Sequence, residues 1–551
     1  MKKLVFAHPF YFYISSAAGC DPVKTIYLCC PQQDAASLEG AEHFAKRTGW
    51  KEIAERAGAV LVVPVAPEGW EAEAPDFLLK LYNETRNSFK SRSGSAIWGR
   101  GGSLWCWETI LYIVGYKEGA VYAGNFLTSH PNFAAAVSLI DGLPEHFEAG
   151  EEESNHWMVK NPKDYFVRNR DIPVCLWAFS SENTDKITAH YASMYDCFAE
   201  EVVGNICTQV YKDSKNQANQ VRIIRADFRD EAERSRFIYT QQFAHVIRWK
   251  NGPDGTLAWV DSKQDFYSST RFLRHSISIA GVSYDYFVHL PKGKETEKNL
   301  PVVFNIHGRG EPAWMYADKN GWNELGDRTG EFIVVTPDSP GNGWFSLRDG
   351  ILFPLMIEEL VKRYQVDQTR IYLAGFSNGA VMVRELAYQH PELYAAVASS
   401  NGPAGDTYSM HQIDESKLPD SFAPEIQTRM DIFAADGWEM PIAFFYGDND
   451  PTVQKEKDLS VPFFLNVNHC DADHGLTCNE SNYFTSENGY QEGNRFSTVA
   501  YSNDENDVRV LVTLMKNMPH GAINEETQLI WEFFRNFCRK KHAKKVERTG
   551  S

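Results

Sequence analysis

An α/β fold, present twice in tandem, is the architecture that this sequence predicts: in each copy a mostly parallel sheet is flanked by helices. Strand-like and helix-like segments alternate along the C-terminal half, and segments of the first half reappear in the same order in the second. In addition, 551 residues are more than one hydrophobic core usually organises. A hydrophobic content of 43% and a charged content of 23% are ordinary for a globular protein.

The alternation is clearest after residue 280. Apolar strands are predicted at Val302–Ile306, Phe332–Thr336, Arg370–Ala374, Ala395–Ser399, Ile442–Tyr446 and Val508–Leu514. Helices are predicted at Ile351–Arg363, Ala380–Gln389 and Glu525–Cys538. Because parallel strands need crossover connections, this alternation predicts a parallel sheet with helices on both faces. The segment from Gly402 to Met440 breaks the pattern and is a candidate cap over a site.

Two long segments recur. Gly49–Val63 resembles Gly321–Val335, 272 positions later, and each copy is typical of a short helix, a glycine stop and a buried strand. Gly115–Val137 resembles Gly375–Val397, with the same internal spacing of Gly, His-Pro and Ala-Ala-Val. Segments in the same order indicate two copies of one fold.

Two weaker pairs support the duplication: Pro173–Trp177 with Pro441–Phe445, and Tyr11–Ile14 with Tyr284–Phe287. The second pair predicts that the N-terminal segment is a strand. We therefore expect domains at 1–252 and 253–551, with the seam in the turn-rich stretch Asn251–Gly255.

The start of the chain, two lysines followed by an apolar run, also resembles a secretory or lipoprotein signal. Because that run matches a strand of the second copy, a cytoplasmic location is expected, and a secreted or lipid-anchored protein is the alternative. Ten cysteines without a CxxC spacing favour a reducing compartment.

The formal net charge of −18 argues against nucleic acid as a partner, because phosphate binding needs a basic surface. No apolar run reaches the ~18 residues that span a bilayer, so no membrane partner is expected. The segment His469–Cys478 has metal-capable side chains but lacks the paired spacing of zinc sites, and a polar loop is the simpler interpretation. No metal and no cofactor are predicted, and the oligomeric state is left open.

A candidate nucleophile lies in Gly375-Phe376-Ser377-Asn378-Gly379, directly after a predicted strand and before a predicted helix. This context is the one that a nucleophile elbow requires. The turn is so sharp that Ser377 must adopt a strained backbone, and the glycines on either side let strand and helix approach. The sequence therefore predicts a nucleophilic serine at 377.

An acid and a base should follow the serine, since a hydroxyl needs a base to take its proton. Asp450 follows the strand Ile442–Tyr446, with Asp448 as the alternative acid. His520 follows the last strand and precedes the last helix, whereas His469 and His474 come before that strand. We predict a triad of Ser377, His520 and Asp450.

The tetrahedral intermediate also needs hydrogen-bond donors for its oxyanion. One is expected from the backbone N–H of Asn378. The other is expected from the turn that begins at His307, where Gly308 and Arg309 are the candidates and the choice stays open.

Two motifs stand out in the second half: Val366–Tyr372 leads into Gly-Phe-Ser-Asn-Gly-Ala, and His307-Gly308 lies upstream. With these motifs, about residues 280–540 resemble the polyhydroxybutyrate depolymerase and feruloyl esterase group of α/β hydrolases. The resemblance implies hydrolysis of a small or oligomeric ester, with Ser377 acylated and then released by water. The group commonly has Gly-His followed by Trp at the base, whereas this chain has Pro519-His520-Gly521-Ala522. Trp314 and Trp344 are candidates for an acyl or aryl pocket, with simple core packing as the alternative.

The first copy has lost most of this chemistry. Lys117 replaces the nucleophile, Glu182 is an acceptable acid, no histidine lies in Val221–Gln241, and Cys29-Cys30-Pro31 replaces the oxyanion turn. Because proline has no N–H to offer, we predict an inactive copy with a structural role. Two alternatives to an esterase remain: a serine peptidase of the prolyl oligopeptidase type, and a non-catalytic binding protein with two degenerate copies.

Overall fold

The chain divides into two compact units: Met1–His156 with Pro162–Ser262, and Trp157–Asn161 with Lys263–Ser551. The computed structural model describes residues 1–5, 8–18, 22–89, 105–147, 151–153, 159–161, 166–168, 172–181, 184–249, 256–279, 281–339, 343–404, 424–453, 459–485 and 491–549. The predicted seam, 251–255, lies outside these residues. The boundary after residue 252 is wrong by ten residues, because β14 (Thr256–Trp259) pairs with β13 (Val246–Trp249) and so belongs to the first unit.

Each unit is built on a ten-stranded sheet, and the two sheets have the same strand order. In the first the order is β1 (Lys2–Val5), β2 (Pro9–Ile14), β4 (Val60–Pro64), β3 (Pro22–Cys29), β5 (Trp105–Tyr116), β6 (Ala136–Ile140), β9 (Cys175–Phe179), β12 (Gln220–Ala226), β11 (Ile206–Lys212) and β10 (Cys197–Val203). In the second it is β15 (Leu273–Ile279), β16 (Val282–His289), β18 (Ile333–Pro337), β17 (Val302–Ile306), β19 (Ile371–Phe376), β20 (Ala396–Ser400), β21 (Ile442–Gly447), β26 (Val508–Met515), β25 (Phe496–Ser502) and β22 (Leu476–Asn479).

The six central strands of the second sheet are mutually parallel, from β18 to β26. The two strands at either edge run antiparallel to their neighbours. Buried apolar residues on both faces of the central strands explain their near-continuous hydrophobic sequences. The predicted mostly parallel sheet is therefore confirmed.

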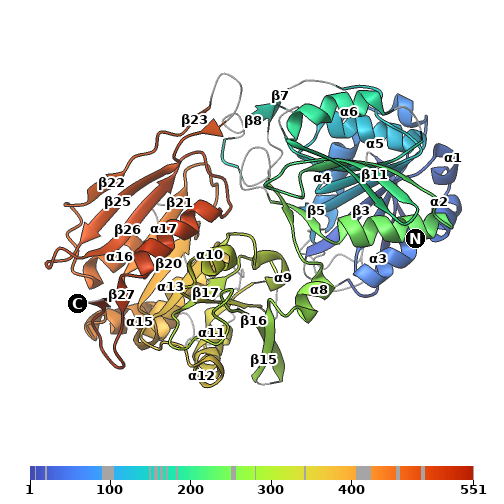
Figure 1. The fold of residues 1–551 in the computed structure, drawn as a ribbon. Helices are drawn as coiled ribbons and strands as arrows, with labels where there is room; N and C mark the ends of the chain where they lie inside the picture. Colours follow the sequence, from blue (N-terminus) through green and yellow to red (C-terminus); the bar gives the residue numbers. More distant parts are fainter. Residues whose placement is uncertain are drawn as a thin grey trace. The chain divides into compact units, whose positions relative to one another are not determined.

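Helices cover both faces of the second sheet (Figure 1). One face packs on α12 (Leu352–Tyr364), α13 (Asn378–Gln389) and α16 (Ser460–Val467), and the other packs on α10 (Trp322–Thr329) and α17 (Asn524–Phe534). Shorter helices of this unit are α8 (Lys263–Ser268), α9 (Ala313–Tyr316) and α11 (Ser346–Asp349). The first unit carries α1 (Gln32–Ala35), α2 (Leu38–Arg47), α3 (Trp50–Ala57), α4 (Phe77–Phe89), α5 (Glu118–Ser129), α6 (Asp185–Tyr191) and α7 (Glu231–Ile238).

Two predicted elements of the second unit need correction. The last helix ends at Phe534 rather than Cys538, because Phe537–Cys538 (β27) pairs with Glu547–Arg548 (β28). Of the candidate cap, residues 405–423 lie outside the described residues. The described helix α15 (Pro424–Ala435) packs Phe433 against Tyr388 of α13, with ring centroids 6.3 Å apart.

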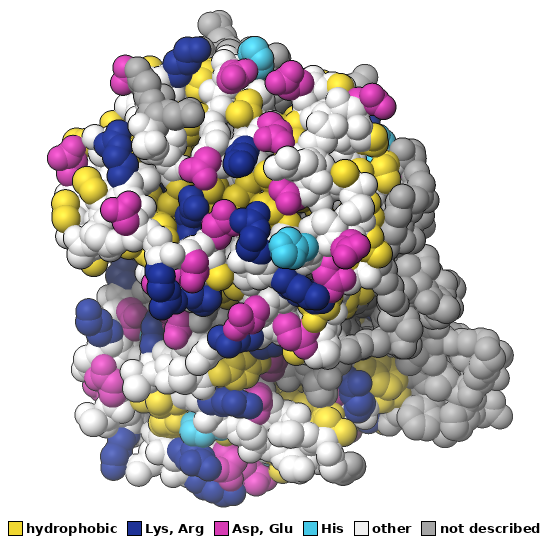
Figure 2. All heavy atoms as spheres, turned by 90° about the vertical axis from the view of Figure 1, so that its right-hand side faces the viewer, with side chains coloured by type: hydrophobic (Ala, Val, Ile, Leu, Met, Phe, Trp, Pro, Cys, Tyr) yellow, Lys and Arg dark blue, Asp and Glu magenta, His cyan; other side chains and the backbone are white. Residues whose placement is uncertain are grey.

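The N-terminal segment is a strand, as predicted. β2 pairs antiparallel with β4, and Phe10 and Phe12 are buried in the first core. In the described part of the chain, no helix has the length and apolarity needed to cross a membrane. On the face drawn in Figure 2, lysine and arginine side chains lie among aspartates and glutamates.

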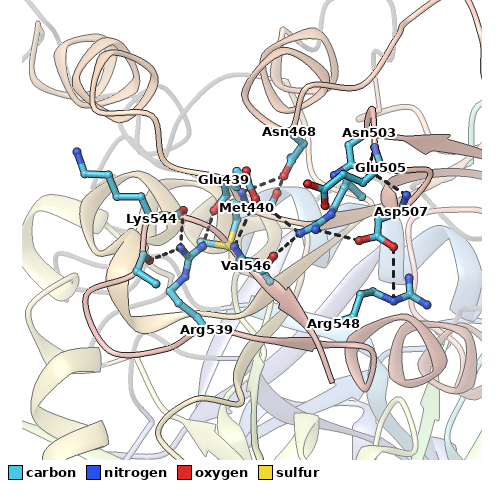
Figure 3. A network of polar contacts seen from close by, with 12 residues as sticks. Glu439, Met440, Asn468, Asn503, Glu505, Asp507, Arg539, Lys544, Val546 and Arg548 are labelled. Carbon is cyan, nitrogen blue, oxygen red and sulfur yellow. Dashed lines mark hydrogen bonds and ion pairs between the residues drawn. The ribbon is translucent and has the colours of Figure 1, made fainter. Parts of the chain in front are cut away.

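A buried polar network secures the C-terminal end of the second unit (Figure 3). Arg539 donates to the carbonyl oxygens of Ala543 and Lys544, both at 2.9 Å. Arg509 donates to the carbonyl oxygen of Val546 at 2.8 Å and lies 3.7 Å from the Glu439 carboxylate. Because these guanidinium groups bind main-chain carbonyls of the tail, the network stabilises the fold of this unit.

Candidate active site

The loops that follow the central strands of the second sheet meet at one edge. The register pairs Ile306 with Gly375, Phe376 with Ser400, and Gly447 with Met515, so β17, β19, β20, β21 and β26 end close to one another. In open α/β sheets, function collects at the carboxyl ends of the strands. All predicted site residues lie in these loops or at the start of the following helix.

Ser377 stands in a strained turn between β19 and α13. Its φ of 54° and ψ of −118° lie outside the regions that non-glycine residues favour. A Cβ at Gly375 would lie 2.3 Å from the carbonyl oxygen of Gly379, and one at Gly379 would lie 2.3 Å from that of Ile306. Only glycine fits at both positions, so the Gly-x-Ser-x-Gly sequence follows from this close approach of strand and helix.

The structure brings the three predicted triad residues together. The Nε2 atom of His520 lies 2.8 Å from Ser377 Oγ, and its Nδ1 atom lies 2.6 Å from Asp450 Oδ2. Because an ionised carboxylate only accepts, Nδ1 carries the proton and Nε2 is left to accept from the serine hydroxyl. All three side chains are buried. This is the arrangement of a catalytic triad, in which a carboxylate orients an imidazole that can accept the proton of a serine hydroxyl.

The alternative acid, Asp448, points elsewhere. Its carboxylate accepts from the backbone N–H of Asn517 at 2.5 Å and lies 3.6 Å from Lys516 Nζ. His474, one of the alternative bases, contacts Asp471 at the surface at 2.6 Å. In the described part of the chain, no group of three or more His, Cys, Asp or Glu side chains could hold a metal ion.

Thr452 also contacts the triad, and sequence reasoning missed it. Its backbone N–H and its hydroxyl both donate to Asp450 Oδ1 at 2.7 Å, and the hydroxyl oxygen lies 3.0 Å from His520 Nδ1. An Asp whose carboxylate accepts from the N–H two residues later is a common local turn, so Asp-Pro-Thr offered a usable signal. Thr452 fixes the rotamer of the acid.

The predicted oxyanion donors lie beside the elbow. Asn378 begins α13, where the first N–H groups lack acceptors within the helix. The Gly308 N–H donates to Glu311 Oε2 at 3.3 Å. Arg309 follows in the same loop, which also contacts the start of α13, because a Cβ at Gly379 would meet the carbonyl oxygen of His307 at 2.5 Å.

Trp344 is part of the core rather than a pocket wall. Its side chain is fully buried, and its Nε1 donates to the carbonyl oxygen of His307 at 2.9 Å. The Asn378 side-chain amide binds the Trp344 backbone, accepting from its N–H at 2.5 Å and donating to its carbonyl oxygen at 3.2 Å. Trp314 is also buried. For Trp344, core packing is therefore confirmed, whereas the pocket role of Trp314 stays a prediction.

Comparisons with known proteins place the chain among hydrolases. The sequence pattern of the prolyl oligopeptidase family matches residues 353–465. The chain is 27% identical over 129 residues to poly(3-hydroxyalkanoate) depolymerase C of Paucimonas lemoignei, covering 21% of this chain and 30% of that protein. It is 26% identical over 143 residues to acetylxylan esterase A of Emericella nidulans, covering 24% and 46%. It is 27% identical over 139 residues to feruloyl esterase B of Thermothelomyces thermophilus, covering 21% and 44%.

The chain spans less than half the length of each of these relatives. The second unit has the α/β-hydrolase fold. The resemblance to depolymerases and feruloyl esterases predicted from the motifs is confirmed by relatives of those names.

Beneath the site, the α/β-hydrolase unit holds buried charges that the sequence did not reveal. Glu311 and Lys319 form an ion pair with both side chains 3% exposed, and Lys319 Nζ lies 4.3 Å from the centre of the Phe376 ring. Glu526 accepts from the Ser400 hydroxyl at 3.0 Å, and burial raises the pKa of its carboxyl to about 8. The backbone carbonyl oxygen of Ser400 accepts from the backbone N–H of Ser377 at 3.0 Å.

The first unit repeats the frame of this site with other side chains. Lys117 has φ 50° and ψ −122° at the start of α5, and a Cβ at Gly119 would lie 2.3 Å from the carbonyl oxygen of Cys29. Trp70 Nε1 donates to the carbonyl oxygen of Cys30 at 2.8 Å, as Trp344 does to His307. Between β12 and α7, residues 227–230 contain no histidine. Glu182, the predicted acid of this copy, lies outside the described residues.

Proposed function

We propose that the protein is a serine carboxylic ester hydrolase whose nucleophile, base and acid are Ser377, His520 and Asp450. One observation carries the proposal: an unbroken hydrogen-bond chain runs from the Asp450 carboxylate through both nitrogens of His520 to the Ser377 hydroxyl. The hydroxyl sits on a strained turn at the carboxyl edge of the sheet, where a substrate carbonyl can approach it.

The reaction then has two halves. His520 Nε2 takes the proton of Ser377 as Oγ attacks the ester carbonyl, and the resulting imidazolium gives that proton to the departing alkoxide. Water, deprotonated by the same nitrogen, attacks the acyl carbonyl. The bond between the acyl carbon and Ser377 Oγ then breaks, Oγ takes the proton back from the imidazolium, and the acid is released. The Asp450 carboxylate, held by Thr452, keeps Nδ1 protonated and stabilises the imidazolium in both halves.

For the oxyanion we propose the backbone N–H of Asn378 and one N–H from the loop after β17. Gly308 and Arg309 are both candidates there, and the Gly308 N–H donates to Glu311 at 3.3 Å. Removing one such donor costs about 3–4 kcal/mol of barrier in comparable hydrolases.

We propose a small-molecule or oligomeric ester as the substrate. The similar proteins are named for a hydroxyalkanoate polymer, acetylated xylan and feruloyl esters, which share an ester of a short or aryl acid. Nucleic acid is not proposed as a partner, since the net charge is −18 and the basic side chains in Figure 2 lie among acidic ones.

Peptide hydrolysis is the second candidate. The match to the prolyl oligopeptidase family favours it, since the matched residues 353–465 include Ser377 and Asp450. The same triad cleaves amides, so the choice depends on the substrate that the site accepts. Turnover of a p-nitrophenyl ester well above that of an aminoacyl p-nitroanilide supports the esterase, and the reverse ratio supports the peptidase.

The deciding experiment is labelling of the full chain with a fluorophosphonate probe, alongside a panel of p-nitrophenyl and feruloyl esters. The wild-type protein should be labelled once, at Ser377. Ser377→Ala should lose labelling and on the order of 10⁵–10⁶ in kcat, as triad nucleophiles do. A folded wild-type protein that neither reacts with the probe nor cleaves any ester would instead support a non-catalytic binding protein.

A further inference from the structure

Asn401 occupies a position between the loops that carry the acid and the base. It follows β20, its side chain and backbone are fully buried, and its φ is 46°, in the left-handed region. Its backbone N–H donates to the carbonyl oxygen of Phe445 at 2.8 Å, which extends the β20–β21 pairing by one residue. Asparagine tolerates this conformation better than most residues. The turn directs its side chain between two loops.

The Asn401 side-chain amide binds both loops at once. Its Oδ1 atom accepts from the backbone N–H of Gly447 at 2.6 Å, and its Nδ2 atom donates to the carbonyl oxygen of Gly521 at 2.6 Å. Gly447 is the last residue of β21, directly before the loop of Asp450, and Gly521 follows His520 directly. One partner can only donate and the other can only accept, so the orientation of the amide is determined by its partners.

The two loops are in close contact at this point. A Cβ at Gly447 would lie 2.4 Å from the carbonyl oxygen of Met518, and the Asn449 N–H donates to that same oxygen at 3.2 Å. A shift of either loop therefore changes the separation between the Asp450 carboxylate and the His520 ring. The Asn401 amide joins both loops to the end of the neighbouring strand β20.

The first unit provides an internal comparison. Asp141 follows β6 with φ 55°, and its N–H donates to the carbonyl oxygen of Phe179 at 3.1 Å, so its backbone repeats that of Asn401. Its side chain, however, is 59% exposed and lies 3.7 Å from Arg234. The left-handed turn thus does not require an amide. The amide occurs in the unit whose loops carry an acid and a histidine.

From these contacts we propose that Asn401 is a positioning residue of the hydrolytic reaction, whose amide sets the distance between the loops of Asp450 and His520. The inference rests on the proposed function, because it assigns Asn401 a role through that triad. It goes beyond the triad by naming a residue that touches neither substrate nor reacting atoms, yet controls the alignment of the base.

The test uses Asn401→Gly in the full chain, because glycine keeps the left-handed turn without strain while it removes the amide. Hydrolysis of p-nitrophenyl acetate should lose on the order of 10² in kcat, the effect of a misplacement of about 1 Å, with KM changed less than about threefold. In an Asp450→Asn background the same substitution should lower kcat less than about threefold, because Asp450 then no longer orients His520.

The matched control is Asn468→Ala. Asn468 is also buried, and its amide binds both main-chain groups of Met440, away from the triad. It accepts from the Met440 N–H at 3.0 Å and donates to the Met440 carbonyl oxygen at 2.7 Å. It should lower the unfolding midpoint like Asn401→Gly but leave kcat within about threefold. Asp141→Gly should change neither.

The outcomes separate the two proposals. A wild-type protein without esterase, amidase or labelling activity overturns the proposed function, and the inference with it. An active wild-type protein whose Asn401→Gly variant keeps its kcat overturns the inference alone. An equal loss in the wild-type and Asp450→Asn backgrounds, or an equal kcat loss in Asn468→Ala, also overturns it, since either shows a purely structural role.

Discussion

Lys117 and Ser377 occupy backbone turns of the same shape in the two units, with φ of 50° and 54° and ψ of −122° and −118°. Each turn follows the third parallel strand of its sheet and starts a helix, and each is flanked by glycines without room for a Cβ. Only one of them carries a hydroxyl with a histidine beside it. The strained turn is therefore a property of the packing of strand against helix, and catalysis depends on the side chains placed around it.

After the loss of Ser377 itself, the largest expected effect concerns the acid of the second unit. Asp450→Asn should lower kcat by about 10⁴, because the amide no longer selects the tautomer of His520 that can accept from Ser377. The kcat of Asp448→Asn, two residues away, should stay within about threefold of the wild-type value, since Asp448 binds Asn517 and not His520. Steady-state ester hydrolysis by both variants measures this. A larger loss in Asp448→Asn than in Asp450→Asn would reverse the assignment.

A second prediction concerns what the two units share. Gly379→Ala and Gly119→Ala should each destabilise their unit by about 1–3 kcal/mol or more, because the added Cβ meets a backbone oxygen at 2.3 Å in both. Gly326→Ala in α10 is the control: its Cβ has only ordinary contacts from 3.5 Å outward, so it should be neutral or stabilising. Urea unfolding followed by tryptophan fluorescence reports all three. Tolerance of alanine at 119 but not at 379 would show that the elbow of the first unit is not under the same constraint.

A third prediction concerns the buried acid beneath Ser400. The pKa of Glu526 rises from 4.5 to about 8 on folding, so the folded state holds a proton that the unfolded state releases. This contribution to stability is fully present below about pH 4.5 and is lost as the pH rises to about 8, by up to about 1.4 kcal/mol per pH unit. Glu526→Gln should flatten the decline in unfolding free energy between pH 5 and 8.

The neighbouring Glu525 is exposed and provides the control for that measurement. Chemical denaturation of Glu525→Gln at a series of pH values should stay close to the wild-type curve, because burial raises the pKa of Glu526 far more than the charge of Glu525 does. If the Glu526→Gln and wild-type curves run parallel across this range, the carboxyl at 526 does not hold its proton on folding.

The smallest effect is expected from Lys117→Ser. The variant gives the first unit a Gly-x-Ser-x-Gly elbow with the right backbone, but residues 227–230 offer no histidine to take the proton. Fluorophosphonate labelling in a Ser377→Ala background should therefore stay at background level. Labelling at position 117 would mean that another group of the first unit can serve as base, and the two units would differ less than proposed.

Most of the fold and the triad follow from patterns that are short and local. Apolar runs predict the buried strands, and Gly-x-Ser-x-Gly predicts the elbow. The order of Ser377, Asp450 and His520 along the chain reduces the number of candidates for the acid and the base. The domain boundary was missed because β14 has only four residues, and only its pairing with β13 shows that it belongs to the first unit. The last helix was predicted too long, since the β27–β28 pairing that ends it involves residues beyond the helix.

The supporting groups could not be found in this way, because each joins positions far apart in the sequence. Glu526 lies 126 residues from Ser400, and Asn401 lies 46 and 120 residues from the two glycines that its amide binds. An isolated Asn-Gly after a strand predicts a turn and nothing more. Such contacts depend on the register of the whole sheet, which determines which loops meet.

The second unit is not a contiguous stretch of chain, since it includes Trp157–Asn161. Within it, the N–H groups of Lys160 and Asn161 donate to the carbonyl and side-chain oxygens of Asn449, at 2.8 and 2.7 Å, and Asn449 precedes Asp450. A recombinant fragment that starts at residue 263 would leave both oxygens of Asn449 without these donors. A fragment that starts at residue 263 is therefore an incomplete second unit, because it lacks two hydrogen bonds to the residue that precedes Asp450.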